Sequence, residues 1–310
     1  MKYFTKEKYY HTLNNYLTNK YHTKVFKVSL NGNFTCPNRD GTISSLGCLF
    51  CSESGSGDFA GEKTETLTEQ FQNVLTRMKE KWPEGKYIAY LQANTNTYAP
   101  LDELKEKYEE IIKIDPNIII FSIATRPDCL SDEVIEYLAE LNKRVEIWVE
   151  LGFQTCHERS AKFINRGYSN EVFVESVNKL RAHNLTTIVH IINGLPNETK
   201  EMMIETAKFL NNLDIQGIKI HMLHVMKNTP LGELYMKKPF NLLTRDEYVD
   251  VVVNQLEHLR KEIVIHRVTG DAPKDLLIEP TWTLKKFVVL NEIDKLMRKE
   301  HRFQGDKVCI

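Results

Sequence analysis

The sequence predicts an α/β fold in which a parallel sheet curves into a partial barrel. Six short runs rich in Val, Ile and aromatic residues alternate with longer stretches of helical character. Several of these runs lack polar alternation, as expected for strands that are buried on both faces. Strands that alternate with helices join into a parallel sheet through right-handed crossovers. The 310 residues suffice for one large α/β domain or two smaller ones.

The predicted elements follow one another in a regular order. The strands are expected at 25–30, 87–92, 118–123, 145–151, 187–192 and 218–223, with 263–268 as a candidate seventh strand. The helices are expected at 62–81, 100–114, 131–143, 170–184 and 198–213, with a last helix around 284–301. Two helix starts place a polar residue before an acidic first turn, Ser131 before Asp132 and Asn197 before Glu198. We expect an N-terminal helical arm (1–24), a barrel (25–240) and a C-terminal extension (241–310) packed on the barrel.

Composition and charge exclude several classes of protein. The formal net charge of −1 excludes a globally basic nucleic-acid binder but leaves room for a local basic patch. No run approaches the roughly 18 apolar residues that a membrane-spanning helix needs, and the N-terminus lacks the apolar core of a signal peptide. We therefore expect a cytoplasmic protein with no membrane partner. Thiols stay reduced in the cytosol, where a cysteine cluster indicates metal binding or catalysis more often than disulfides.

Three of the six cysteines, Cys36, Cys48 and Cys51, lie in the loop that follows the first predicted strand. Such loops assemble the active sites of α/β barrels. A structural zinc ion needs four ligands, and the loop holds no fourth Cys or His. An iron–sulfur cluster held by three thiolates leaves one iron open to another ligand, which is the interpretation we favour. Unconnected buried thiols are a third alternative, although the surrounding Gly, Asn, Asp and Ser are typical of an exposed loop.

The other three cysteines, Cys129, Cys156 and Cys309, are far apart in the sequence and indicate no second cluster.

The cysteine loop resembles that of the radical SAM superfamily, whose three cysteines follow the first strand of a partial (β/α)6 barrel. The usual spacing is C-x3-C-x2-C, whereas this loop has C-x11-C-x2-C. The long spacing, with CPNRDG and GCLFCSESGSGDF, resembles a bacterial branch of the YtqA/YhcC type, related to the catalytic subunit of Elongator. The resemblance implies a [4Fe–4S] cluster on Cys36, Cys48 and Cys51, S-adenosylmethionine (SAM) on the open iron, and a 5′-deoxyadenosyl radical. It also implies a reductant such as flavodoxin or ferredoxin.

The same resemblance implies that side chains at the ends of successive strands bind SAM. Phe50 matches the aromatic residue near the adenine, with a core aromatic as the alternative. Gln92 and Asn94 stand in place of the usual Gly-Gly-Glu and can still bind an ammonium group. Gln154 and Arg166 match a SAM-binding glutamine and its companion arginine, both suited to a zwitterionic ligand.

The further expected SAM contacts are Thr125, His190 and Leu223. For His190, where relatives carry an aspartate, a core histidine is the alternative. The catalytic residues are not identified by the sequence, and the candidates are Tyr98, Arg126 and His221. Arg126, in TRPD, is either a ligand for a substrate phosphate or carboxylate or a member of a salt bridge.

The N-terminal 27 residues hold six lysines, one acid and seven aromatic residues. Lysines neutralise phosphates and aromatic rings stack on bases, so this arm is a candidate RNA contact. An amphipathic helix packed on the barrel is the alternative. The resemblance implies tRNA as partner and conversion of a wobble-uridine C5 substituent from carboxymethylaminomethyl to aminomethyl. The alternatives are a small metabolite or porphyrin-like substrate, or a zinc-stabilised, non-catalytic RNA-binding protein.

Overall fold

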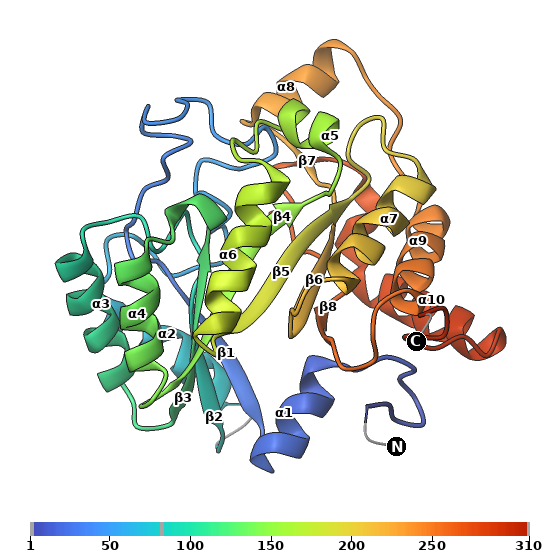
Figure 1. Cartoon of the computed structure of the whole chain (residues 1–310). Helices are drawn as coiled ribbons and strands as arrows, with labels where there is room; N and C mark the ends of the chain where they lie inside the picture. Colours follow the sequence, from blue (N-terminus) through green and yellow to red (C-terminus); the bar gives the residue numbers. More distant parts are fainter. Residues whose placement is uncertain (1–2, 81–83, 309–310) are drawn as a thin grey trace.

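The structure is a computed structural model that describes residues 3–80 and 84–308. Its centre is a seven-stranded sheet in the order β1-β2-β3-β4-β5-β6-β8, in which all neighbouring strands are parallel. The strands are β1 (Val25–Leu30), β2 (Lys86–Leu91), β3 (Ile118–Thr125), β4 (Glu146–Gln154), β5 (Thr186–Asn193), β6 (Gly217–Met222) and β8 (Val264–Arg267). Figure 1 shows the sheet curled with its helices outside. The predicted partial barrel is confirmed, and each predicted strand is present.

The predicted helices are also present, most of them shorter at their ends. They are α2 (Leu67–Lys79), α3 (Leu101–Lys113), α4 (Asp132–Leu141), α6 (Asn170–Ala182), α7 (Lys200–Asn211) and α10 (Lys286–Lys299). Ser131 caps α4 as predicted, because its side chain accepts a hydrogen bond from the backbone of Val134. The start predicted at Asn197 is wrong. Thr199 caps α7 instead, and Asn197 has a left-handed φ of 68°.

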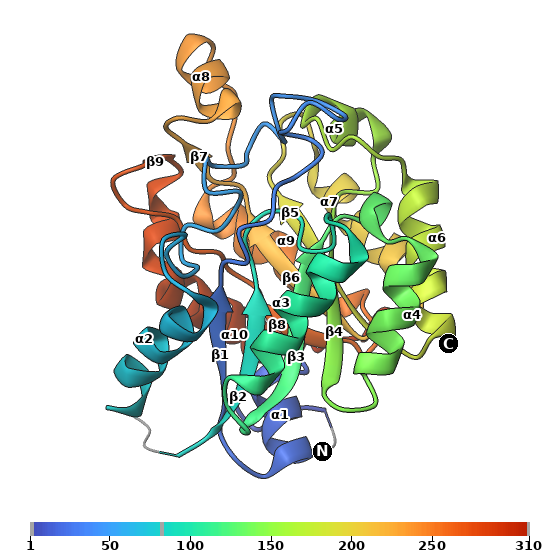
Figure 2. The same cartoon turned by 90° about the vertical axis from the view of Figure 1, so that its left-hand side faces the viewer.

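Several elements were not predicted from the sequence. They are α5 (Glu158–Phe163), α8 (Pro230–Lys237), α9 (Arg245–Glu257), the two-stranded ribbon of β7 (Val225–Met226) and β9 (Leu277–Glu279), and the 3-10 turns η1 (Pro127–Cys129) and η2 (Thr281–Lys285). Figures 1 and 2 place α5, α8 and β7 beyond the ends at which the barrel strands finish. α9 contacts both α7 and α10 in the C-terminal part. The boundaries at 24/25 and 240/241 stay predictions.

The N-terminal arm forms α1 (Leu13–Tyr21), which packs under the opposite end of the barrel (Figure 1). Leu17 of this helix joins an apolar cluster inside the barrel with Ile88, Ile120, Trp148 and Ile188. Lys20 pairs at 2.6 Å with Glu146, the first residue of β4. The packing alternative is therefore observed, at the end of the barrel away from the cysteine loop, and an RNA contact of the arm stays a prediction. Lys2, also counted in the arm, lies outside the described residues.

Among the described residues, no helix is both long enough and apolar enough to cross a membrane.

Candidate active site

The cysteine loop leaves the end of β1 and is fastened to the turn after α5. The side-chain amide of Asn38 donates to the carbonyl of Asn165 at 2.7 Å, and that of Asn165 donates to the carbonyl of Gly47 at 2.7 Å. The backbone N–H of Leu49 donates to the carbonyl of Ile164 at 3.0 Å. These contacts hold the eleven residues between Cys36 and Cys48 against the barrel, so the long spacing forms an ordered loop.

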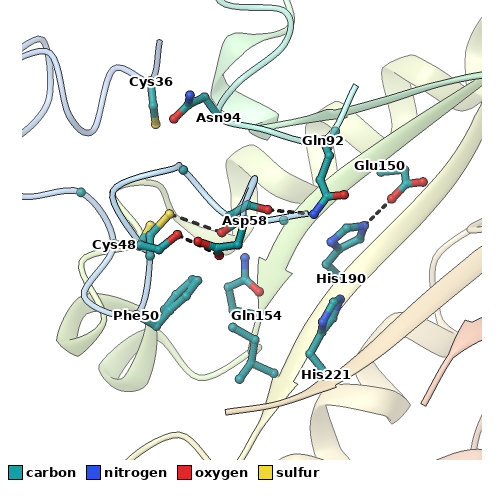
Figure 3. Close-up of a pocket in the computed structure, with 18 of the residues that line it drawn as sticks. Cys36, Cys48, Phe50, Asp58, Gln92, Asn94, Glu150, Gln154, His190 and His221 are labelled. Atoms are coloured by element: carbon teal, nitrogen blue, oxygen red, sulfur yellow. Dashed lines mark hydrogen bonds and ion pairs between the residues drawn. The ribbon is translucent and has the colours of Figure 1, made fainter. Parts of the chain in front are cut away.

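The loop closes one side of a cavity of about 410 Å³ at the carboxyl ends of the barrel strands. The predicted site residues that line this cavity are Cys36, Cys48, Phe50, Cys51, Gln92, Asn94, Thr125, Arg126, Gln154, His190, His221 and Leu223. Figure 3 shows Phe50 and Gln154 extending toward each other below the cysteines. The structure therefore brings together residues that are up to 187 positions apart in the sequence.

Tight packing fixes the residues around the thiols. A side chain at Gly55 would place its Cβ 1.9 Å from the Asn94 amide oxygen, so the loop can approach β2 only with glycine there. The Gln92 amide donates to the carbonyl of Ser56 at 2.9 Å. Gln154 adopts a left-handed φ of 70° where the pairing of β4 with β5 shifts register. This strained backbone ends the strand at the residue that faces Phe50.

A buried ionic network forms the floor of the cavity. The carboxylate of Glu150 accepts hydrogen bonds from Ser122 at 2.6 Å, Lys27 at 3.1 Å and His190 at 2.6 Å, and it also pairs with Lys219. Burial alone would raise the pKa of Glu150, but Lys219 and Lys27 outweigh it and hold the pKa well below its ordinary value. Glu150 is therefore ionised. These five residues come from β1, β3, β4, β5 and β6, so the network ties most of the sheet together.

His190 is a neutral hydrogen-bond donor in this network. Burial and the nearby charge of Lys219 lower the pKa of His190 to about 4, against the opposing effect of Glu150. An ionised carboxylate only accepts hydrogen bonds, so Nε2 carries the proton and Nδ1 is an acceptor. Figure 3 shows this contact between His190 and Glu150. Both ammonium groups, of Lys27 and Lys219, lie over the ring of Tyr90, 4.2 and 4.3 Å from its centroid.

Arg126 is held in a salt bridge, the alternative given above. Its guanidinium pairs with both oxygens of Asp128, at 2.9 and 2.7 Å, and donates to the carbonyl of Arg166 at 2.9 Å. It also lies 4.9 Å from the ring centroid of Tyr168. The charge of Arg126 favours the thiolate form of Cys48, although burial and the thiol of Cys51 raise the pKa of Cys48 to about 12. Arg126 thus places a fixed positive charge beside the cysteines.

Two predicted site residues lie elsewhere. Arg166 is 1% exposed and does not line the cavity; its guanidinium donates to the carbonyls of Phe153, Thr155 and Tyr168 at 2.8 to 3.1 Å. Tyr98 lines a separate hollow, where its hydroxyl lies 2.9 Å from that of Thr42. The geometry favours a scaffolding role for Arg166, since protein carbonyls occupy its donors, and its direct contact with SAM stays a prediction. The catalytic candidacy of Tyr98 has no support in this geometry.

Sequence reasoning missed the charged residues of the floor and one acid in the loop. Lys27, Glu150 and Lys219 each interrupt an apolar strand, and a charge inside a buried strand was the available signal. Asp58 also lines the cavity, where its carboxylate accepts from the hydroxyls of Ser52 and Ser54 at 3.0 and 2.7 Å. Its position in a polar loop gave no comparable signal.

Two family models match the chain. The model described as the Radical SAM superfamily matches residues 40–210, more than half of the chain, and the Radical_SAM C-terminal domain model matches residues 215–299. The chain belongs to the radical SAM superfamily. The predicted enzyme class and its cofactors, a [4Fe–4S] cluster and SAM, are thereby confirmed. The alternative of a zinc-stabilised protein without catalysis is wrong.

Relatives of this radical SAM enzyme support the predicted branch. The protein YtqA of Bacillus subtilis (strain 168) is 52% identical over 303 residues, which cover 98% of this chain and 94% of YtqA. The protein YhcC of Escherichia coli (strain K12) is 32% identical over 293 residues, which cover 93% of this chain and 92% of YhcC. The predicted YtqA/YhcC branch is therefore confirmed.

Two more distant matches come from Methanocaldococcus infernus. The solved structure of the archaeal Methanocaldococcus infernus Elp3 with an N-terminal deletion covers 91% of this chain and 64% of its own, with a TM-score of 0.66 at 18% identity. That likeness shows the fold. A tRNA uridine(34) acetyltransferase of Methanocaldococcus infernus is 25% identical over 190 residues, which cover 58% of this chain and 35% of that relative.

The three thiols of this radical SAM enzyme line one cavity, where they can act as ligands of a [4Fe–4S] cluster. Within residues 3–80 and 84–308, no three His, Cys, Asp or Glu side chains converge closely enough to hold one metal ion. Thiolates that bind a cubic cluster each hold a different iron and need not converge. Two thiols also have polar neighbours, since the Asn38 amide lies 3.5 Å from Cys48 Sγ and the Ser56 hydroxyl lies 3.3 Å from Cys51 Sγ. Such contacts around ligands orient and tune a metal centre.

The other described cysteines do not line the cavity. Cys129 lines the separate hollow that also contains Tyr98. Cys156 packs at the edge of the main core and accepts a hydrogen bond from the Thr206 hydroxyl at 3.4 Å. Cys309 lies outside the described residues. These positions leave Cys36, Cys48 and Cys51 as the thiols of the cavity.

Proposed function

We propose that this enzyme converts the carboxymethylaminomethyl group at C5 of a tRNA wobble uridine into an aminomethyl group. The observation that carries the proposal is the similarity of more than half the chain to a tRNA uridine(34) acetyltransferase, on a barrel that resembles Elp3. Wobble bases lie in an anticodon loop and are already partly unstacked, so presenting one to the cavity costs little free energy.

We place the proposed tRNA contact at the end of the barrel opposite to the N-terminal arm. Exposed lysines lie there on α5 and at the end of α8, namely Lys162, Lys237 and the following Lys238. Figure 1 places both helices at the end of the barrel where the cysteine loop lies. Lysines at this rim can neutralise phosphates on either side of an extruded base, which makes binding depend on salt.

When bound, the cluster and SAM supply a 5′-deoxyadenosyl radical at the cavity. Loss of a hydrogen atom from the carbon next to the substrate carboxylate, and then of one electron and of the proton on nitrogen, leaves an imine. Water hydrolyses the imine to the aminomethyl product and glyoxylate. The lost electron replaces the one first supplied by a reductant such as flavodoxin or ferredoxin, so SAM, cleaved to methionine and 5′-deoxyadenosine, is the net oxidant.

The chain's own residues hold the reacting groups in place. Cys36, Cys48 and Cys51 would bind the cluster, and Phe50, Gln154 and Leu223 would surround the adenosine. Phe50 packs in one apolar cluster with Leu223, which gives a flat apolar surface suited to a purine. The ionised Glu150 keeps His190 oriented with Nδ1 free to accept a hydrogen bond.

Mass spectrometry of tRNA nucleosides from a deletion strain tests the proposal. Carboxymethylaminomethyluridine should accumulate and aminomethyluridine should disappear, with restoration by the wild-type gene but not by Cys48→Ala. An unchanged wobble-uridine profile would refute the tRNA substrate and favour a small metabolite or porphyrin-like substrate. The proposed substrate also implies activity in the cytoplasm, where tRNA is matured.

A further inference from the structure

Arg267 is a cation without a protein partner in the wall of the cavity. It is the last residue of β8, is half-buried, and lines the cavity. Within the described structure its guanidinium makes no hydrogen bond and no ion pair. A guanidinium has five donors in a rigid fork that matches a carboxylate, and buried examples are normally paired.

A shift in the pairing of β8 with β6 directs the Arg267 side chain into the barrel. Arg267 pairs with Lys219 of β6, whereas Ile265 pairs with Ile218, so β8 carries one extra residue, His266, between them. A bulge of this kind re-aims the side chains that follow it. Arg267 therefore shares the inner face with Lys219, one step away from the Glu150 network.

Two histidines beside Arg267 also lack partners. The Nε2 atoms of His221 and His224 are buried and have no hydrogen-bond partner, and both side chains line the cavity. The backbone of Gly270 closes over them, since a Cβ there would lie 3.0 Å from His224 and 3.6 Å from His221. A buried polar atom without a partner is costly, and a ligand in the cavity would satisfy it.

The charges facing this end of the cavity leave an excess of positive charge. Lys27 and Lys219, which do not line the cavity, share the single carboxylate of Glu150, whereas Arg267 lines the cavity without an acid as partner among the described residues. The nearby carboxylate of Asp271 is paired with Lys286 at 2.7 Å. An anionic group bound in the cavity would neutralise the charge of Arg267.

We propose that Arg267, His221 and His224 form an anion subsite that binds the carboxylate of the substrate's carboxymethylamino group. The inference rests on the proposed function and names the residues that would recognise its substrate. Binding the carboxylate here would place the adjacent carbon inside the cavity, between this subsite and the cysteine loop. The reaction removes the carboxylate from the tRNA as glyoxylate. The product tRNA then lacks the group that the subsite binds, which favours its release.

The carboxylate of SAM is the other possible source of the same chemistry. The cysteine loop has cations of its own, because the guanidinium of Arg39 donates to the carbonyl of Cys51 at 3.1 Å and Arg126 also lines the cavity. Arg267 lies beside His221 and His224, whose Nε2 atoms have no partner, whereas Arg39 lies against the backbone of the cysteine loop. On this ground we assign Arg267 to the carboxylate of the substrate.

The test compares two anticodon stem-loops that differ by the carboxylate alone, one with 5-carboxymethylaminomethyluridine and one with 5-methylaminomethyluridine. Reconstituted wild-type enzyme should prefer the first, and Arg267→Gln should lose roughly 10- to 150-fold in affinity for it and little for the second. Arg267→Lys, which keeps the charge but not the fork, should fall between. Arg245→Gln, at an exposed arginine, is the matched control.

The affinity for SAM is measured in the same variants. It should be unchanged in Arg267→Gln; a loss there with the RNA preference intact would assign Arg267 to SAM and overturn the inference. Equal preference for the two RNAs in wild type and Arg267→Gln would also overturn it.

If the wild type itself does not distinguish the RNAs, the proposed substrate is wrong and a second probe decides on the subsite. Saturation-transfer NMR with N-methylglycine and with dimethylamine detects weak binding of a carboxylate without RNA. Binding of N-methylglycine alone, lost in Arg267→Gln, would keep the anion subsite for another substrate. No binding of either compound would overturn it.

Discussion

Lys27 on the first strand and Glu150 on the fourth form an ion pair inside the barrel, with 3.1 Å between Nζ and Oε1. The Glu150 side chain is fully buried, and Lys219 pairs with its other oxygen. The negative charge of Glu150 and the positive charges of Lys27 and Lys219 compensate one another inside the barrel. The pair therefore links strands that are not neighbours in the sheet.

Glu150→Gln should lower the free energy of unfolding by about 3–5 kcal/mol, because it leaves the buried ammonium group of Lys219 and the half-buried one of Lys27 without a counter-charge. Urea denaturation followed by circular dichroism measures the change. Glu140→Gln, at an exposed pair with Lys143, is the control and should cost no more than about 1 kcal/mol. Equal costs for the two variants would contradict the role assigned to Glu150.

Cys36→Ala, Cys48→Ala and Cys51→Ala should each abolish the cluster, because each removes the anchor of one iron. Iron content and absorbance after anaerobic reconstitution measure the loss against the roughly four irons of the wild type. Cys129→Ala and Cys156→Ala are matched controls, since neither thiol lines the cavity. Loss of the cluster in Cys129→Ala would show that the ligands are assigned wrongly.

Gln154→Ala and Arg166→Ala should separate cosubstrate binding from scaffolding. Gln154→Ala should weaken SAM binding by about 2- to 12-fold, the effect of one neutral hydrogen bond, with stability little changed. Arg166→Ala should instead destabilise the fold by at least about 2 kcal/mol, because it leaves buried carbonyls unpaired. Calorimetry with SAM and thermal unfolding distinguish the two. A stable Arg166→Ala protein that no longer binds SAM would instead support the direct contact.

Stability should fall as the pH falls from about 6.5 toward 4. The pKa of His190 is about 4 in the folded protein and 6.5 in the unfolded chain. At a pH between these two values, unfolding therefore takes up a proton. This histidine alone should remove about 1 kcal/mol of stability between pH 7 and pH 5.5. His190→Asn should flatten that dependence, while His183→Asn, at an exposed histidine, should not. Urea midpoints at both pH values give the comparison.

Substitutions of the N-terminal lysines should leave tRNA affinity unchanged, because α1 packs at the end of the barrel away from the cavity. Lys237→Glu with Lys238→Glu should weaken binding and reduce its salt dependence. Filter binding at several salt concentrations measures both. Weaker binding on replacing Lys20, with α8 variants unaffected, would return the RNA contact to the arm.

The alternation of strands and helices could be predicted because burial on both faces leaves a continuous apolar run in each strand. α9 escaped prediction although Thr244 and Glu247 form a capping box, because Val251, Val252 and Val253 favour a strand by intrinsic preference. Burial of these valines in the folded protein overrides that preference.

Some residues of the candidate site could likewise be predicted from the sequence, and others only from the structure. Spacing and resemblance identified the cysteines, which act through their own chemistry. Arg166 has the residue type of a ligand, but only the structure reveals that its donors are occupied by carbonyls. Arg267 was not predicted, since its inward direction depends on a shift in pairing that no sequence pattern specifies.

The layer around Trp148, closed from outside by α1, has a consequence for the order of events in a catalytic cycle. In the part of the chain that the structure describes, this layer fills the end of the barrel where the strands begin, so ligands do not reach the cavity through that end. A macromolecule bound over the opposite end of the barrel, where the strands finish, would keep SAM and its products in the cavity. SAM should therefore enter before the tRNA, and methionine and 5′-deoxyadenosine should leave only after the tRNA has departed.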